Sequence, residues 1–325
     1  MLDEDLNSKV AGGDGADPMV SIVVPVYDER DALPGLIEEI DAMAAKSGLE
    51  LEMIFVDDGS ADGTGAYLSE RASEREDITV IVLRRNVGKS GALSAGLEAS
   101  RGDVVVTLDG DGQDDPAEIP ALTAKLADGY DLVSGWKQER KDVWRRRIAS
   151  RLFNRATARV SGVKLHDFNN GLKAYRGERA RELQLYGEMH RFIPVLGAQQ
   201  GWRVTEVPVN HRPREHGRSK FGLERYLRGM LDLLAIVFMD RYGTRPLHLF
   251  GGIGIFCFLI GVGFGCYLTV EKISGEAIGD RPLLLLSILM IVVGIQFCTF
   301  GLLAQMLVVI RQDHVSSRRQ ADGDP

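Results

Sequence analysis

The chain has 325 residues, of which 45% are hydrophobic and 26% charged, and its formal net charge is −7 at pH 7. This length exceeds one average domain, so we expect a main domain with an additional part. The acidic balance argues against a general nucleic-acid binder, although local basic clusters are present.

The first 18 residues are rich in Gly and Asp, a composition typical of a disordered leader. They lack the charged, apolar and small-residue segments of a secretory signal. We therefore expect the domain that follows, residues 19–220, to remain in the cytosol.

This domain alternates between apolar, β-branched runs and helix-like segments. The predicted strands are 20–26, 51–56, 78–83 and 104–108, and the predicted helices are 31–46, 64–73, 90–99 and 116–127. Such alternation predicts an α/β fold, a parallel sheet covered by helices on both faces. Ligands of open parallel sheets bind beyond the carboxyl ends of the strands, and a polar segment follows each of the four strands here.

The fourth strand ends in a glycine-flanked turn that carries two carboxylates one residue apart, Asp109 and Asp111. Both can reach a hard divalent cation, whose remaining ligands are usually water and substrate phosphates. Such a cation would neutralise a departing nucleotide diphosphate. An ordinary solvated turn is the alternative, because an isolated Asp-x-Asp pair is a weak signal.

Three neighbouring segments have simpler explanations. Residues 57–63 are typical of a turn and a helix cap. Asp115 precedes a proline and stands three residues before Glu118, the spacing of a helix N-cap, whereas Asp114 is assigned to neither role. Residues 88–90, Gly-Lys-Ser, lack the earlier glycine of a nucleotide-binding phosphate loop, so we exclude an ATPase.

Taken together, four segments resemble glycosyltransferase family 2, and more closely its polyisoprenyl-phosphate branch of dolichol-phosphate mannose synthases and bactoprenol glucosyltransferases. The segments are Ser21-Ile-Val-Val-Pro-Val-Tyr-Asp-Glu29, Val56-Asp-Asp-Gly-Ser60, Asn86-Val-Gly-Lys89 and Asp109-Gly-Asp-Gly-Gln-Asp-Asp-Pro-Ala-Glu118. The resemblance extends from about residue 20 to residue 310. It implies a GT-A type, Rossmann-like, mostly parallel sheet.

The resemblance also implies roles for individual residues. Those matching the family's nucleotide-sugar site are Pro25, Tyr27, Glu29, Asp58 and Asp109. Those matching its site for Mg²⁺ or Mn²⁺ and the diphosphate are Asp109, Asp111 and Gln113, and Asp111 is also a catalytic candidate. Because Gly110 and Gly112 replace bulkier residues of the common family version, we expect a looser loop.

The segment Asp167-Phe-Asn-Asn-Gly-Leu-Lys-Ala-Tyr-Arg176 resembles the family segment that places an aspartate near the acceptor. Asp167 is therefore a candidate catalytic base or acceptor-positioning group. A phosphate monoester is already largely ionised at neutral pH, which favours positioning over proton removal. A turn residue before a strand is the alternative for Asp167.

Two basic clusters are candidates for binding the acceptor phosphate or the diphosphate. Arg218, Ser219 and Lys220 match a phosphate-binding segment of the family. Arg147 and Arg151 begin a stripe of arginines spaced four apart on a predicted amphipathic helix. For this stripe we favour attraction to anionic lipid headgroups.

The C-terminal part predicts membrane attachment. Residues 221–245 have the mixed pattern of interfacial amphipathic helices. Within residues 246–311, the segments 247–270 and 282–310 lack charged residues and are long enough to span a bilayer as a hairpin. All three cysteines lie in these spans, which argues against zinc sites and disulfides. The flanking arginines place the catalytic domain and the tail, 312–325, at the cytoplasmic face of the plasma membrane.

The predicted reaction is an inverting, metal-dependent transfer of a hexose from a nucleotide sugar to undecaprenyl or dolichyl phosphate, giving a β-linked lipid monophosphate sugar. UDP-glucose is the favoured donor and GDP-mannose the alternative. A processive polysaccharide synthase is disfavoured because Gln-x-x-Arg-Trp is absent. A non-catalytic, membrane-anchored scaffold that binds nucleotide sugars is the alternative of another class. A homo-oligomer rests on family analogy alone.

Overall fold

The computed structural model describes residues 19–138, 154, 155, 157–159, 161–210, 212, 238, 245–278 and 281–321, with side chains described up to residue 310. The chain divides into two units, residues 1–233 and 234–325. The expected leader, residues 1–18, and nearly all of the expected interfacial segment, 221–245, lie outside the described residues.

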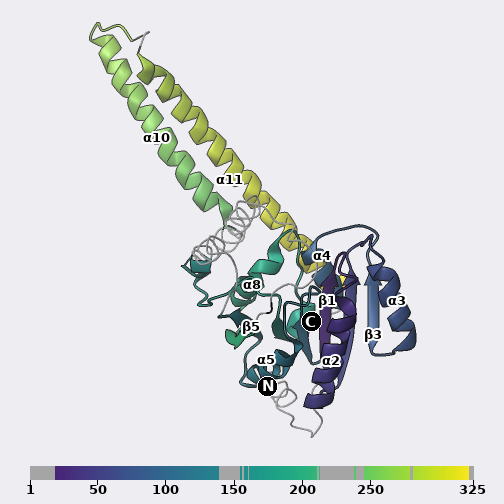
Figure 1. The fold of residues 1–325 in the computed structure, drawn as a ribbon. Helices are drawn as coiled ribbons and strands as arrows, with labels where there is room; N and C mark the ends of the chain where they lie inside the picture. Colours follow the sequence, from purple (N-terminus) through teal and green to yellow (C-terminus); the bar gives the residue numbers. More distant parts are fainter. Residues whose placement is uncertain are drawn as a thin grey trace. The chain divides into compact units, whose positions relative to one another are not determined.

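The first unit contains a seven-stranded sheet (Figure 1). Its strands are β1 (Val20–Val26), β2 (Leu51–Asp57), β3 (Ile78–Val82), β4 (Val104–Thr107), β5 (Leu132–Lys137), β6 (Lys173–Arg176) and β7 (Val204–Val209). Their order is β3-β2-β1-β4-β6-β5-β7, and only β6 among the described strands runs antiparallel to its neighbours. The four predicted strands are confirmed, each ending within one residue of its predicted boundary.

Helices cover both faces of the sheet. The described helices of this unit are α2 (Leu33–Ser47), α3 (Thr64–Glu74), α4 (Lys89–Ala99), η1 (Pro116–Glu118), α5 (Ile119–Ala127), α7 (Gly177–Arg181), η2 (Met189–Phe192) and α8 (Ile193–Gln199). Apolar side chains of α2 and α5 form one core with the even-numbered residues of β1. Those of α4 form a second core with Val23 on the other face. Alternation along each strand thus builds the two-faced sheet that the sequence predicts.

The reversed strand β6 decides what meets at one edge of the sheet. Lys173, its first residue, lies opposite Thr107 near the end of β4 and opposite Ser134 in β5. The start of β6 therefore lies at the same edge as the carboxyl ends of the parallel strands. The sequence did not predict β5, β6 or β7.

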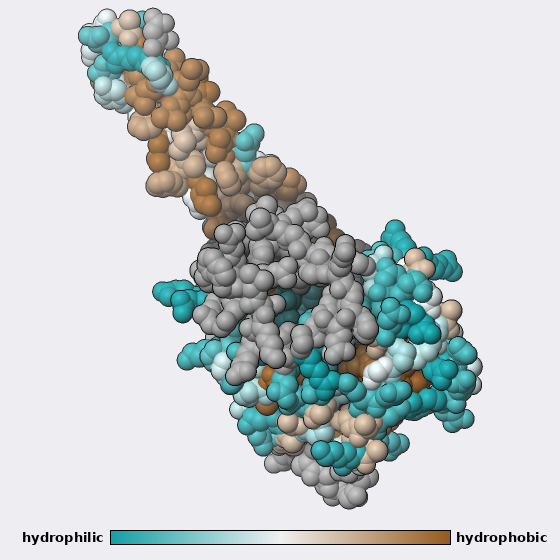
Figure 2. Space-filling model, in the orientation of Figure 1, coloured by the Kyte–Doolittle hydropathy of each residue, from teal (hydrophilic) through white to brown (hydrophobic). Residues whose placement is uncertain are grey.

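The described residues of the second unit form two antiparallel helices, α10 (Pro246–Ile273) and α11 (Pro282–Ala321) (Figure 1). By length and composition, Pro246–Ile273 and Pro282–Ile310 could each cross a membrane. Glycines let the helices approach closely: a Cβ on Gly254 would lie 2.6 Å from Cys298 Sγ, and one on Gly261 would lie 2.8 Å from the Ser287 carbonyl oxygen. The surface of this pair is mainly hydrophobic, except near the connection between the helices (Figure 2).

A buried carboxylate joins three segments at the amino-terminal edge of the sheet. Glu52 in β2 is 3% exposed and accepts hydrogen bonds from the Ser21 hydroxyl at 2.6 Å and the Arg101 backbone N–H at 2.7 Å. The Arg101 guanidinium donates to it as well, at 2.8 Å. Burial alone would raise the pKa of Glu52, but these hydrogen bonds lower it below its ordinary value of 4.5.

We expect Glu52→Gln to lower the stability of the first unit by about 2 kcal/mol at neutral pH, since a buried charged hydrogen-bond acceptor is lost. Because the folded-state pKa is the lower one, the carboxylate stabilises the fold above pH 4.5 and loses this effect as the pH falls through its folded-state value. Thermal unfolding of both proteins from pH 7 to pH 3 checks this. A stability gap that widens in acid would contradict it.

Candidate active site

The four polar segments predicted to follow β1 to β4 do converge at one edge of the sheet. The registers pair Val26 with Asp57 and Asp57 with Val82, so the carboxyl ends of β1, β2 and β3 are level. Hydrogen bonds then connect the segments that follow. The Asp28 backbone N–H donates to Ser60 Oγ at 2.9 Å, and the Glu29 N–H donates to Thr64 Oγ1 at 3.2 Å.

Residues 57–63 form the turn and helix cap that their composition predicts. Asp57 accepts a hydrogen bond from the Ser60 backbone N–H at 3.0 Å, and Asp62 accepts one from the Thr64 N–H, the first residue of α3, at 3.0 Å. Asp58 has a different partner, the segment that follows β3.

Asp58 is 4% exposed, and its carboxylate accepts hydrogen bonds from the backbone N–H groups of Val87 at 2.7 Å and Gly88 at 2.9 Å. Asp58 therefore fixes the loop that leads into α4. Tyr27, 39% exposed, and Pro25 lie at the end of β1 beside this loop system. The nucleotide contacts of Pro25, Tyr27, Glu29 and Asp58 remain predictions.

The acidic turn after β4 packs closely on β1 and contains a hydrogen bond of its own. A Cβ on Gly110 would lie 2.6 Å from Val26 Cγ1, so this glycine allows the turn to pack against β1. Gly112 has a φ of +71°, which favours glycine. Asp111 accepts a hydrogen bond from the Gln113 N–H at 3.1 Å. Asp115 caps η1 by accepting from the Ala117 N–H at 3.0 Å, as predicted.

Arg212, beyond β7, holds the far side of this turn. Its N–H donates to the Gln113 carbonyl oxygen at 3.1 Å, and its guanidinium pairs with Asp115 at 2.9 Å and with Glu39 at 2.6 Å. Among these partners, Glu39 belongs to α2. The turn is thus fixed to elements from both ends of the domain.

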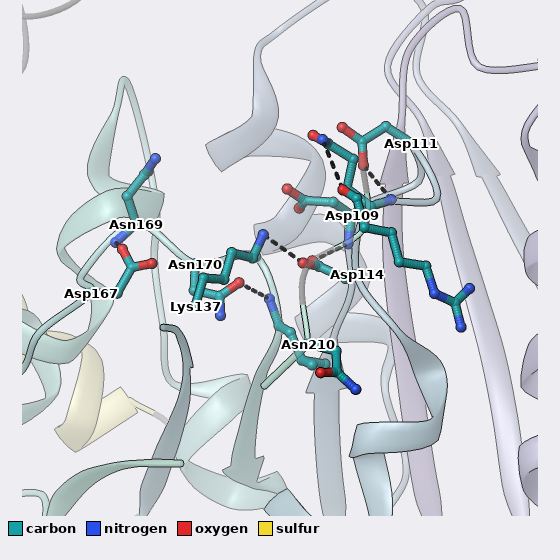
Figure 3. Close-up of polar contacts among 12 residues, drawn as sticks. Asp109, Asp111, Asp114, Lys137, Asp167, Asn169, Asn170 and Asn210 are labelled. Carbon is teal, nitrogen blue, oxygen red and sulfur yellow. Dashed lines mark hydrogen bonds and ion pairs between the residues drawn. The ribbon is translucent and has the colours of Figure 1, made fainter. Parts of the chain in front are cut away.

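Three carboxylates and three lysines gather at this edge, and Figure 3 shows four of them, Asp109, Asp114, Asp167 and Lys137. The carboxylates are Asp109, Asp114 and Asp167, and the lysines are Lys89, Lys137 and Lys173. Asp109 pairs with Lys89 from the start of α4, and Asp114, 1% exposed, pairs with Lys137 from the end of β5 at 2.7 Å. Three negative and three positive charges can lie together in a largely buried volume because each offsets the cost of burying the others.

These neighbours shift the titration of the cluster. Burial alone would raise the pKa of Asp109, but Lys89 lowers it well below its usual range. Burial would lower the pKa of Lys137, but Asp114 raises it above its ordinary value. Lys173 is 2% exposed, and burial together with nearby Lys89 lowers its pKa to about 8.

The segment before β6 packs directly on Asp109. A Cβ on Gly171 would lie 2.3 Å from Asp109 Oδ1, so only glycine fits there. The Thr107 hydroxyl donates to the Gly171 carbonyl oxygen at 2.8 Å, and Lys173 Nζ donates to the Asn170 carbonyl oxygen. These contacts fix residues 170–173 against the acidic turn.

Asp167 lies across the cluster from the acidic turn, with Lys137 between them (Figure 3). It is 2% exposed and accepts a hydrogen bond from the Asn169 N–H at 3.2 Å. Asp167 therefore forms a turn before β6, as the alternative for this residue predicts. Its charge also acts to raise the pKa of Lys137, and it opposes the burial that lowers the pKa of Lys173. The role of Asp167 as a catalytic base or acceptor-positioning group remains a prediction.

Beside Asp109 lies a small pocket with hydrogen-bond donors in its wall. Its polar lining includes Lys89, Asn169, Asn170, Lys173 and His190. Ser90 Oγ accepts the His190 backbone N–H at 3.1 Å and lies 3.0 Å from His190 Nδ1. Burial and then Lys89 lower the pKa of His190 well below 6.5, so the ring is neutral.

Sequence reasoning missed Lys89, Lys137, Lys173 and His190 as site residues. Lys89 and Lys173 stand inside the segments that carry the family resemblance, which was the available signal. Lys137 and His190 follow no local pattern. Of the predicted phosphate-binding residues, Arg147, Arg151, Arg218, Ser219 and Lys220 lie outside the described residues.

Comparisons with known proteins agree with this geometry. Residues 21–183 match the family described as glycosyl transferase family 2. The dodecaprenyl-phosphate galacturonate synthase of Rhizobium johnstonii is 38% identical over 89% of this chain and 87% of its own. The undecaprenyl-phosphate 4-deoxy-4-formamido-L-arabinose transferase of Klebsiella pneumoniae is 35% identical over 90% of this chain and 89% of its own.

Among solved structures, glucosyl-3-phosphoglycerate synthase from Mycobacterium tuberculosis, in complex with Mn²⁺, UDP-glucose and phosphoglyceric acid, has a TM-score of 0.53. It is 20% identical and covers 73% of this chain and 83% of its own, a likeness that shows the shared fold. Together with the family match, the two relatives of similar length show that the chain belongs to glycosyl transferase family 2 and is a glycosyltransferase.

Proposed function

We propose that this chain transfers a sugar from a nucleotide sugar to a polyprenyl phosphate with inversion at the anomeric carbon. The observation that carries the proposal is the extent of the likeness to polyprenyl-phosphate sugar transferases, 89% to 90% of the chain. The family match ends at residue 183. Likeness of that extent must therefore include much of the C-terminal half, where the two candidate membrane spans lie.

The donor diphosphate would bind at the acidic turn with Mg²⁺ or Mn²⁺. The residues fit such a cation because Asp109 and Asp111 supply oxygen ligands, with Gln113 beside them. The ammonium of Lys89 already contacts Asp109, which supports a positively charged partner at this carboxylate. Among the described residues no group of three or more His, Cys, Asp or Glu side chains could hold a metal, so substrate oxygens would complete the shell. When bound, the cation would stabilise the leaving diphosphate.

The lysines would supply the rest of the positive charge. Lys89 could turn from Asp109 to the diphosphate once a cation occupies the carboxylate. Lys173 is fixed by the Asn170 carbonyl oxygen and faces the same pocket. Donors held in place by the fold stabilise developing negative charge without reorganisation, which is the main contribution expected here.

The acceptor phosphate would approach the sugar from the side of Asp167. Its oxygen attacks the anomeric carbon as the bond to the diphosphate breaks, which inverts the linkage and gives a β-linked product. We assign Asp167 to orienting the acceptor through Lys137, because an ionised phosphate needs no base and would repel a bare carboxylate. Arg218, Ser219 and Lys220, with Arg147 and Arg151, would hold the phosphate. The two spans would keep the lipid tail in the bilayer, with the active site on the cytoplasmic side.

For the donor, the relatives' names favour a modified sugar over the predicted UDP-glucose. One relative is named for galacturonate and the other for 4-deoxy-4-formamido-L-arabinose. Lys173 lines the pocket beside Asp109, and its ammonium would complement the carboxylate of a uronate while Lys89 serves the diphosphate. We therefore propose a nucleotide-linked hexuronate as the donor.

We expect Asp111→Asn to lower the transfer rate at saturating donor by about 100-fold or more, since a neutral amide binds a divalent cation poorly. Chelation should abolish the wild-type reaction, and added Mg²⁺ or Mn²⁺ should restore it. Asp128→Asn, at an exposed end of α5, is the matched control and should transfer normally. The measurement is radiolabelled sugar transfer to undecaprenyl phosphate by the purified full chain. Full activity of Asp111→Asn in the presence of chelator would refute the metal site.

A donor panel tests the sugar. UDP-galacturonate should be used at least about tenfold more efficiently, in kcat/KM, than UDP-glucose or GDP-mannose, which corresponds to one favourable charge contact. The 4-formamido-arabinose donor completes the panel. Preference for UDP-glucose would reject the hexuronate while leaving the transfer to polyprenyl phosphate intact.

A further inference from the structure

His166, the residue before Asp167, has partners for both of its backbone polar groups and for its ring, although the ring is largely exposed. The His166 backbone N–H donates to Glu206 Oε2 at 2.8 Å, and its ring Nδ1 contacts Glu206 Oε1. Its carbonyl oxygen accepts a hydrogen bond from Asn154 Nδ2 at 2.6 Å. The ring stacks on Trp136 with centroids 4.1 Å apart and planes 14° apart. Both backbone polar groups and the side chain of one residue are thus fixed.

The chemistry of Glu206 defines the arrangement. A carboxylate only accepts hydrogen bonds, so the His166 ring carries its proton on Nδ1. The side chain of Glu206 is 13% exposed, whereas that of His166 is 66% exposed. The mostly buried carboxylate of Glu206 therefore binds both the backbone and the ring of His166, a residue whose side chain is otherwise in water. An exposed histidine in a simple surface turn needs no such partner.

The base of this arrangement is a rigid strand pair. In the parallel register of β5 and β7, Glu206 lies opposite Ser134, and Trp136 is two residues further along β5 on the same face. Lys137, the next residue of β5, pairs with Asp114 in the charge cluster. The same strand pair therefore positions both His166 and one lysine of the active site.

We propose that Glu206 is a positioning residue that acts through His166 to hold the carboxylate of Asp167 toward Lys137, through which it would orient the acceptor. The inference rests on the proposed function, in which Asp167 orients the acceptor phosphate. Rotation of the peptide between His166 and Asp167 would turn this carboxylate away from Lys137 and Lys173. A displacement of about 1 Å in a positioning group can cost about 100-fold in rate.

A double-mutant cycle measures this coupling. Glu206→Ala should lower kcat by about 10- to 100-fold while the KM for the nucleotide sugar changes less than about twofold. Glu206→Gln should lose less, because its amide oxygen still accepts one N–H. If Glu206 acts through Asp167, then Glu206→Ala should slow an Asp167→Asn enzyme by no more than about twofold. Two effects that multiply in the double variant would overturn the proposal.

Glu52→Gln separates positioning from stability. Glu52 is also a buried strand carboxylate that accepts a backbone N–H, but it lies at the opposite edge of the sheet. The Glu52→Gln variant should have a lower thermal unfolding midpoint and an unchanged kcat per folded molecule. If Glu206→Ala behaves in the same way, with normal kcat per folded molecule, Glu206 has only a structural role.

Amide hydrogen exchange in the full chain keeps this test independent of the proposed function. The His166 and Asn169 amides donate to Glu206 and Asp167, so both should exchange faster in Glu206→Ala than in the wild type or in Glu52→Gln. A wild-type protein that transfers no sugar would reject the proposed function alone. Unchanged exchange at these two amides would reject the role of Glu206, whatever the activity.

Discussion

The direction of one short strand determines the active site. Because β6 is antiparallel, its first residue, Lys173, lies opposite Thr107 and Ser134, and the segment leading into it reaches the edge where the parallel strands end. A parallel strand in the same position would carry this segment to the other edge, where Glu52 lies. Asp167, Gly171 and Lys173 meet the acidic turn only through this reversal, so the two halves of the site depend on it.

Charge compensation then sets the geometry of the site. Moving an isolated ammonium or carboxylate from water into a protein costs several kcal/mol, and this cost is offset only by close, well-oriented partners. Lys137 pairs with Asp114 at 2.7 Å although both side chains are largely buried. Lys173 keeps only part of this compensation, which is why its pKa falls to about 8. The three carboxylates and three lysines of the cluster therefore compensate one another.

The sequence predicted the first half of the sheet well because each of its strands is a continuous apolar run. Strand β6 was not predicted because two of its four residues, Lys-Ala-Tyr-Arg, are charged. These two side chains are buried only through partners distant in sequence. The acidic turn was visible as a local motif, and Asp167 through a family segment. Lys137 was not visible in the sequence, because it joins the site only by pairing with Asp114, which lies far from it in the chain. A local pattern reveals the carboxylates of the turn, whereas their lysine partners are set by tertiary structure.

The glycines around Asp109 allow the backbone to pack closely at the site. Gly110 packs on β1, Gly112 adopts a positive φ, and Gly171 leaves room for the Asp109 carboxylate. Each removes a side chain where backbone and carboxylate must approach closely, so the turn is fixed by contact on both sides. Asp167 has no such packing from glycine, and its peptide is fixed instead by hydrogen bonds to its neighbour His166. The acidic turn is therefore held by close packing, and the turn at Asp167 by hydrogen bonds of His166 to Glu206 and Asn154.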